Sequence, residues 1–193
     1  MKTSGWKTVT VVLVGVLAAM VYVVTMFRFP LLGSKVHFAN AVCLLAGMLL
    51  GPLPGGVAAG LGSALYDAFN GYDTANVLIT FVSKFAMGAV CGALMRMPGS
   101  RRAKADRTLL AAAAGAVTYV ALYMLKTWVY SVFVYSYPAE TVGTVMAGKL
   151  IPSLINAGVA IVAAPLFYHA VLPALRASGM PLPAREEAVK DVR

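Results

Sequence analysis

Long apolar runs, separated by short segments rich in glycine, proline or charged residues, make up most of the chain. A helix that crosses the hydrocarbon core of a bilayer needs about 20 predominantly apolar residues, and several of these runs approach that length. The pattern therefore predicts an all-α integral membrane protein, built as a bundle of six transmembrane helices. We expect these helices at about residues 9–27, 36–50, 57–69, 77–95, 109–135 and 142–172.

Proline and glycine modify three of these expected helices. The helices at 36–50 and 57–69 are short and are joined by Gly-Pro-Leu-Pro-Gly-Gly at 51–56, which is typical of a tight hairpin. Pro152 and Pro165 lie inside the last apolar run, and proline removes a backbone donor from a helix. We therefore expect the last helix to be broken or kinked near these two residues.

The composition indicates that lipid is the solvent of this chain. Of its 193 residues, 60% are hydrophobic and only 12% are charged, and the mean hydropathy is +0.80, too apolar for a soluble domain of this length. Because six spans use about 120 residues, we expect a single transmembrane domain over 1–193, with 173–193 as a cytosolic tail. The run at 9–27 is too long for the apolar part of a signal peptide and is kept as the first span.

The basic residues predict the orientation of the bundle. The net charge of +9 comes mainly from Lys and Arg in the N-terminal segment, in the segment 96–107 and after the last apolar run, whereas only Arg28 and Lys35 fall in the loops on the opposite side. By the positive-inside rule, this asymmetry places both termini in the cytosol. Because the charges lie between apolar spans, they indicate contact with membrane lipid headgroups rather than with nucleic acid.

Small residues recur every four positions in three of the expected helices. Gly56 and Gly60 in the third helix, and Gly88 and Gly92 in the fourth, place glycines on one face, where two helices can approach closely. The first helix has a similar smooth patch, made of Gly15, Ala18 and Ala19. Because this helix is otherwise plainly apolar, its patch could instead face a partner subunit.

Three lysines lie inside the expected spans, namely Lys84, Lys126 and Lys149 in the last three helices. An intramembrane lysine is costly and by default marks a functional site or a buried pair. Each lies roughly seven to nine residues from the expected outer end of its helix, or about 10 to 14 Å deep at the helical rise. Three lysines at one depth suggest one cavity.

Other polar residues share helical faces with these lysines, since residues three, four or seven positions apart lie on one side of a helix. A hydrated pocket open to the outside would satisfy so many polar groups. The candidate substrate-binding residues are Lys84, Lys126, Lys149, Asn40, Asp67, Asn76, Thr80, Tyr123, Tyr130, Asn156 and His37, and the aligned positions Ser63, Asn70, Tyr119 and Ser153 accompany them. In a purely structural interpretation, Asp67 pairs with a lysine and the amides bridge helices, although Asp67 can neutralise only one of the three lysines.

The motifs for ATP binding and catalysis are incomplete. Residues 143–150 read Gly-Thr-Val-Met-Ala-Gly-Lys-Leu, and Leu150 stands where a phosphate-binding loop needs Ser or Thr. Ser63, His37 and Asp67 could form a hydrolytic triad, but no nucleophile-elbow sequence accompanies them. The two cysteines lie in apolar runs, as small buried residues do. We therefore expect no enzyme activity, no metal site and no cofactor.

Three segments, taken in order, resemble the substrate-binding S components of energy-coupling factor (ECF) vitamin transporters. They are residues 29–40 (FPLLGSKVHFAN), 51–67 (GPLPGGVAAGLGSALYD) and 80–84 (TFVSK), followed by Gly88. The chain looks most similar to the branch associated with riboflavin and hydroxymethylpyrimidine-type substrates. The resemblance covers the first four expected helices better than the last two.

This resemblance implies the substrate-binding subunit of an ECF-type ABC importer in the bacterial plasma membrane, with a six-helix bundle and cytosolic termini. It implies that a water-soluble vitamin or precursor binds in an outer-half pocket. The ligand would be released inward by tilting with a T component, which two cytosolic ATPases drive. In the family, an Ala-x-x-x-Ala motif on the first helix docks the T component, and Gly15 and Ala19 match it with glycine at the first position.

The residues leave two other functions open, a self-sufficient small-molecule carrier and a membrane-embedded enzyme, either of which would use the lysine cluster. A carrier often has an internal repeat, and the two halves of this chain show none. Copurification with a pair of ATPases would separate these hypotheses. The charge of the ligand is also open, because three lysines favour an anion whereas the resemblance favours a neutral heterocycle.

Overall fold

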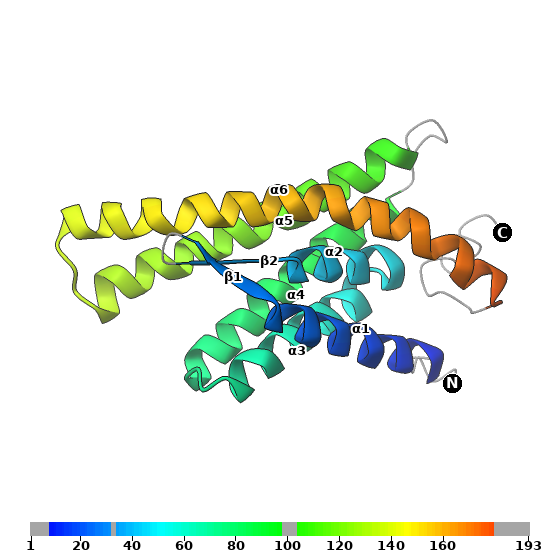
Figure 1. Cartoon of the computed structure of the whole chain (residues 1–193), viewed down its shortest axis with the longest axis horizontal. Helices are drawn as coiled ribbons and strands as arrows, with labels where there is room; N and C mark the ends of the chain where they lie inside the picture. Colours follow the sequence, from blue (N-terminus) through cyan, green and yellow to red (C-terminus); the bar gives the residue numbers. More distant parts are fainter. Residues whose placement is uncertain (1–7, 32–33, 98–103, 180–193) are drawn as a thin grey trace.

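A computed structural model describes residues 8–31, 34–97 and 104–179. Figure 1 shows an elongated helical bundle in which α5 and α6 run side by side and extend beyond the other helices at one end. The elements in chain order are α1 (Thr8–Met26), β1 (Arg28–Leu31), β2 (Ser34–His37), α2 (Ala39–Leu50), α3 (Pro52–Phe69), α4 (Thr74–Arg96), α5 (Lys104–Val129), the π-helical turn η2 (Tyr130–Val134) and α6 (Ala139–Ala177). Most of the expected cytosolic tail, from residue 180 onward, lies outside the described residues.

The structure confirms the predicted all-α bundle of six helices, but the helices differ in kind. Within the described residues, four segments are long and apolar enough to cross a membrane: Thr8–Met26, Thr74–Arg96, Arg107–Val134 and Ala139–Ala177. In contrast, α2 has only 12 residues, about 18 Å at the helical rise, and every one of them is buried. A helix that is hydrophobic all round is stable when neighbours cover it, so α2 forms the centre of the bundle.

Two of the expected helix boundaries were wrong near glycine and proline. Val36 and His37, expected at the start of the second helix, belong to β2, which pairs antiparallel with β1 in the register Arg28↔His37 and Phe29↔Val36. Phe29 precedes a proline, and such a residue favours extended backbone. The third helix starts at Pro52 rather than at residue 57, because proline suits the first helical position, so the turn shrinks to Gly51, whose φ of 84° suits glycine.

The last helix is continuous, so of the two expected outcomes, a break or a kink, the structure excludes the break. A single helix, α6, runs for 39 residues and contains Pro152, Pro165 and Pro173. Figure 1 shows that it bends towards its C-terminal end rather than splitting into two helices. Proline is tolerated inside transmembrane helices when neighbouring groups satisfy the freed backbone. At about 58 Å by the helical rise, α6 is much longer than a hydrocarbon core of roughly 30 Å.

The glycines of α3 and α4 bring these two helices into close contact, as predicted. A methyl group added at Gly56 would lie 2.9 Å from the ring of Phe85, and one at Gly60 would lie 3.0 Å from the ring of Phe81. On α4, a methyl group at Gly88 would lie 3.0 Å from the backbone oxygen of Gly55. Such distances leave no room for a side chain, so the backbones themselves form the interface.

The N-terminal end of α1 and the C-terminal end of α6 lie at the same end of the bundle. Figure 1 shows the N-terminal end of α1, the C-terminal end of α6 and the α2–α3 junction at one end, while the α3–α4 turn and the α5–α6 connection lie at the other. The α2–α3 junction is held by Arg96, which donates a hydrogen bond from Nη2 to the backbone oxygen of Leu50 at 3.0 Å. A common side for both termini fits this arrangement, and their cytosolic location stays a prediction.

We predict that Gly92→Ala lowers the stability of the purified protein by about 1 to 3 kcal/mol, the usual cost of overpacking a close-packed core. The added methyl group would lie 2.6 Å from the backbone nitrogen of Pro52 and 2.8 Å from the oxygen of Gly47. Thermal unfolding in detergent measures the effect. The matched control is Gly158→Ala on α6, where a methyl group meets nothing within 4 Å. Equal melting temperatures for the two variants would contradict the proposed backbone contact.

Candidate functional site

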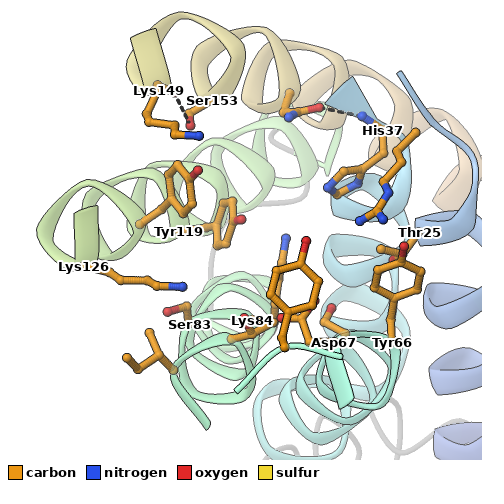
Figure 2. Close-up of a pocket in the computed structure, with 17 residues that line it drawn as sticks. Thr25, His37, Tyr66, Asp67, Ser83, Lys84, Tyr119, Lys126, Lys149 and Ser153 are labelled. Carbon is orange, nitrogen blue, oxygen red and sulfur yellow. Dashed lines mark hydrogen bonds between the residues drawn. The ribbon is translucent and has the colours of Figure 1, made fainter. Parts of the chain in front are cut away.

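A polar cavity of about 430 Å³ opens among α3, α4, α5, α6 and the β-hairpin. It lies towards the end of the bundle opposite the chain termini, because its lining includes Tyr72 of the α3–α4 turn and His37 of β2. Figure 2 shows these side chains pointing into a common space from all sides. The lining consists of Thr25, Arg28, His37, Ser63, Tyr66, Asp67, Tyr72, Ile79, Thr80, Ser83, Lys84, Tyr119, Tyr123, Lys126, Lys149, Ser153 and Asn156.

Lys84 of α4 forms the floor of the cavity and is only 4% exposed. Its ammonium nitrogen, Nζ, donates a hydrogen bond to Oδ1 of Asn40 on α2. The same nitrogen lies 3.6 Å from the ring centroid of Tyr119 on α5, in a cation–π contact. A buried ammonium group needs such partners to offset lost hydration. Lys84 thus ties three helices together directly beneath the cavity.

The α5 wall combines aromatic rings with a second lysine. Tyr119 and Tyr123 lie four residues apart on one face, and their rings are stacked with centroids 6.0 Å apart and planes 23° from parallel. Lys126 follows three residues later, with Nζ 5.5 Å from the ring centroid of Tyr130. This wall offers a flat aromatic surface next to a cation, which suits a planar ligand.

The β-hairpin and α6 form the remaining side of the cavity. The backbone N–H of His37 donates to Oδ1 of Asn156 on α6 at 2.9 Å, the hydrogen bond drawn in Figure 2. The guanidinium carbon of Arg28 lies 4.8 Å from the ring centroid of Tyr66 on α3. One turn before Ser153, Lys149 projects from α6 towards the cavity (Figure 2). The hairpin is therefore attached to both α6 and α3.

The structure gathers most of the sequence-predicted site residues around this one cavity. Those that line it are His37, Asp67, Thr80, Lys84, Tyr123, Lys126, Lys149 and Asn156. The lining also includes Ser63, Tyr119 and Ser153, which share their helical faces. The lysines of α4, α5 and α6 thus face one space, as their similar depth in the sequence suggested.

Three predicted site residues do not line the cavity. Asn40 is buried beneath it as the partner of Lys84. Asn76 lies in the first turn of α4, where its backbone N–H and side-chain amide both donate to the carboxylate of Asp73, the N-cap residue. Tyr130 lies on η2 and lines a separate, almost wholly apolar hollow of about 350 Å³ between α4 and α5. Helical spacing predicts which residues lie on one face of a helix, but it does not predict the partner that each side chain contacts.

Some cavity residues were missed by the sequence analysis. Arg28 carried a usable signal, because it is one of only two basic residues in the loops expected outside, where the positive-inside rule makes them rare. Tyr72 lies near the expected outer membrane boundary, where aromatic residues are common whether or not they face a pocket. Thr25, Tyr66, Ile79 and Ser83 had no distinguishing pattern. Within the described residues, no group of three or more His, Cys, Asp or Glu side chains could hold a metal ion.

The candidate docking patch on α1 is smaller than expected. Gly15 and Ala19 are exposed, and a methyl group at Gly15 would meet nothing within 4 Å. Ala18 is only 4% exposed, because it packs against Gly62 of α3. Ala18 is therefore corrected from a docking residue to a packing residue. The exposed patch that remains is Gly15 and Ala19 with the neighbouring valines Val11, Val12 and Val16.

Comparisons with known proteins agree on the kind of protein. A family model described as "ECF-type riboflavin transporter, S component" matches residues 5–172. A solved structure described as "Structure and mechanism of the S component of a bacterial ECF transporter" aligns with a TM-score of 0.61 and 19% identity, covering 86% of this chain and 96% of its own. "Crystal structure of FolT bound with folic acid" aligns with a TM-score of 0.61 and 20% identity, covering 86% and 97%. The search of curated proteins gave no match.

The two solved structures support the fold, and the family match covers most of the chain. S components of ECF transporters are substrate-binding subunits in the plasma membrane and are not enzymes. The chain therefore belongs to the family of ECF-type riboflavin transporter S components.

Proposed function

We propose that this S component binds a water-soluble vitamin or vitamin precursor in the polar cavity beside the β-hairpin. The observation that carries the proposal is that charged and aromatic side chains from α3, α4, α5, α6 and the β-hairpin converge on one space within the bundle. Polar groups this numerous are expensive inside a membrane and are kept where they meet a ligand. The cavity of about 430 Å³ also falls in the size range of small-molecule sites.

The aromatic lining supports a heterocyclic ligand. The stacked pair Tyr119 and Tyr123, with Tyr66 and Tyr72 elsewhere on the lining, offers ring faces to a flat molecule. Riboflavin, which the family model names, and folic acid, which one solved relative binds, both contain fused aromatic rings. A ligand of the riboflavin or hydroxymethylpyrimidine type is therefore our expectation for this chain.

Transport would require a T component and two cytosolic ATPases, with the cavity facing outward while it captures the ligand. We assign docking of the T component to the patch formed by Gly15 and Ala19 on α1. Two features support this assignment. The patch is exposed and smooth, and α1 contributes only Thr25 to the cavity. Tilting of the whole bundle would then carry the cavity towards the cytosol and release the ligand.

The experiment that tests the function combines ligand identification with transport. Mass spectrometry of the chain purified from cells should detect a copurifying vitamin or precursor. Uptake of that compound by cells should require the T component and both ATPases together with this chain. Uptake by the chain alone would instead favour a self-sufficient carrier. If no compound copurifies and no uptake occurs, the proposal fails.

We predict that Lys84→Met weakens binding of the copurifying ligand by about 10-fold to 150-fold, the value of a charge-assisted hydrogen bond of roughly 1.5 to 3 kcal/mol. Methionine keeps the apolar stem of lysine but removes the ammonium group at the cavity floor. Binding titration of the purified variant measures the change. The control is Arg176→Met. Arg176 lies in the last turn of α6, remote from the cavity, so this variant should bind the ligand normally.

Lys84 could instead serve only to hold α4 against Asn40 and Tyr119. The melting temperature of Lys84→Met separates these roles. Lost stability with unchanged affinity would show that Lys84 is structural. Unchanged stability and unchanged affinity would show that it is a bystander.

We predict that Gly15→Trp and Ala19→Trp abolish uptake in the assembled transporter but leave ligand binding by the isolated chain intact. A bulky ring on a smooth helix face would hold the T component away. Paired uptake and binding assays measure the two effects. Val162→Trp on α6 is the matched control, because Val162 is 60% exposed and apolar but lies on another helix. Normal uptake by both α1 variants would show that this face of α1 does not dock the T component.

A further inference from the structure

The apolar hollow between α4 and α5, here called the α4–α5 hollow, lies where these two helices separate. Closer to the chain ends they touch, because a methyl group added at Gly115 of α5 would lie 2.7 Å from the backbone oxygen of Met87 on α4. Further along, larger side chains hold the helices apart and leave a space of about 350 Å³. The hollow is lined by Leu78, Ile79, Val82, Ser83, Leu122, Leu125, Lys126, Val129 and Tyr130.

The α4–α5 hollow opens on the outside of the bundle, towards lipid. Three of its lining residues, Leu78, Val82 and Leu125, are 60%, 59% and 56% exposed. Both helices belong to segments long and apolar enough to cross a membrane. Large exposed apolar residues also lie elsewhere on α5, namely Leu110 and Val117. The mouth of the hollow is therefore continuous with the surface that this membrane protein presents to the bilayer.

The hollow lies at the depth of acyl chains. The lining residues of α4 begin at Leu78 and end at Ser83, about 6 to 14 Å from the start of the helix at Thr74 by the helical rise. The lining residues of α5 lie at a similar depth, measured from the opposite end of that helix. Because half of the hydrocarbon core is about 15 Å thick, the hollow spans most of one leaflet.

Neither water nor a water-soluble ligand suits this space. Apolar cavities of about 150 Å³ in other proteins stay dry and accept hydrocarbon molecules such as benzene. Ser83 and Lys126 also line the polar cavity, and Figure 2 shows the ammonium group of Lys126 directed into that cavity. The surface left to the hollow is almost wholly apolar. An empty hollow would deprive its lining atoms of van der Waals partners, so hydrocarbon is the matching occupant.

We propose that an acyl chain of a bilayer phospholipid occupies the α4–α5 hollow as a bound lipid. The chain contacts protein on both flanks, whereas lipid on the convex surface of a helix contacts protein on one side only. More van der Waals contacts hold it in place. Ile79, Ser83 and Lys126 line both the hollow and the polar cavity, so a single layer of side chains separates the two. The bound chain thus supports the wall of the polar cavity from the lipid side.

Photolabelling of the unaltered full-length chain tests this site. The chain is reconstituted in phosphatidylcholine vesicles that contain some phosphatidylcholine with a diazirine group on one acyl chain. Exchange into detergent then removes loosely held lipid before irradiation and peptide mass spectrometry. We expect label at residues of the hollow, such as Leu78, Val82 and Leu125, and loss of label at Leu110 and Val117. Equal labelling of both sets, or no label at all, would overturn the proposal.

Filling the hollow gives an independent measurement. A tryptophan ring takes the place of the acyl chain in Val82→Trp on α4 and in Leu125→Trp on α5, so each variant should lose the label on the opposite helix. Val117→Trp is the control, because Val117 is 63% exposed on α5 but lies outside the hollow, and it should keep the label. Full labelling of both filled variants would refute the position. If a filled variant does not fold, the labelling pattern of the unaltered chain still decides.

Two other occupants give different results in the same variants. If Val82→Trp kept the lipid label but weakened ligand binding, the hollow would belong to the ligand site. If it kept the label and the ligand but blocked uptake in the assembled transporter, a helix of a partner subunit would cover the hollow. Either result overturns the bound lipid. The lipid label itself is measured without ligand, so failure of the proposed function leaves this test unaffected.

Discussion

The site depends on the contacts that the buried ammonium group of Lys84 makes with Asn40 and Tyr119. Lys84 lies in the middle of α4 and is only 4% exposed, so little water reaches it. Its ammonium group instead contacts Asn40 of α2 and the ring of Tyr119 of α5. Because each partner comes from a different helix, the lysine can be buried only if α2, α4 and α5 meet around it. Asn40 belongs to the fully buried helix α2, which lies at the centre of the bundle.

Glycine packing determines where the bundle is tight and where it opens. At the end that holds the chain termini, Gly47, Gly51, Gly55, Gly88 and Gly92 bring the backbones of α2, α3 and α4 together. Towards the other end of α4, the side chains of Thr80, Ser83 and Lys84 face the cavity instead. The same helix therefore closes the bundle with one half and lines the site with the other. Glycines form the packed half of α4, and polar side chains form the half that lines the cavity.

The cavity relates this chain to its family and also distinguishes it. Membership of the S-component family makes the chain a substrate-binding membrane subunit, and polar side chains converge on one cavity of its bundle. The excess of basic groups over Asp67 is a property of this sequence, which the family name does not convey.

The sequence by itself determined the class of protein, the six helices, the close glycine contacts and the shared depth of the three lysines. These follow from local rules, since apolar length, helical period and residue size act within one segment. Local rules also explain the two wrong helix boundaries. The extended backbone before Pro30 and the helix start at Pro52 were local signals that the longer apolar runs obscured. Tertiary structure alone decided that α6 stays continuous through three prolines, that Ala18 packs against Gly62, and that Asn40 lies beneath the cavity while Arg28 lines it. Each of these outcomes depends on which neighbour occupies the facing position, and that neighbour comes from a distant part of the chain.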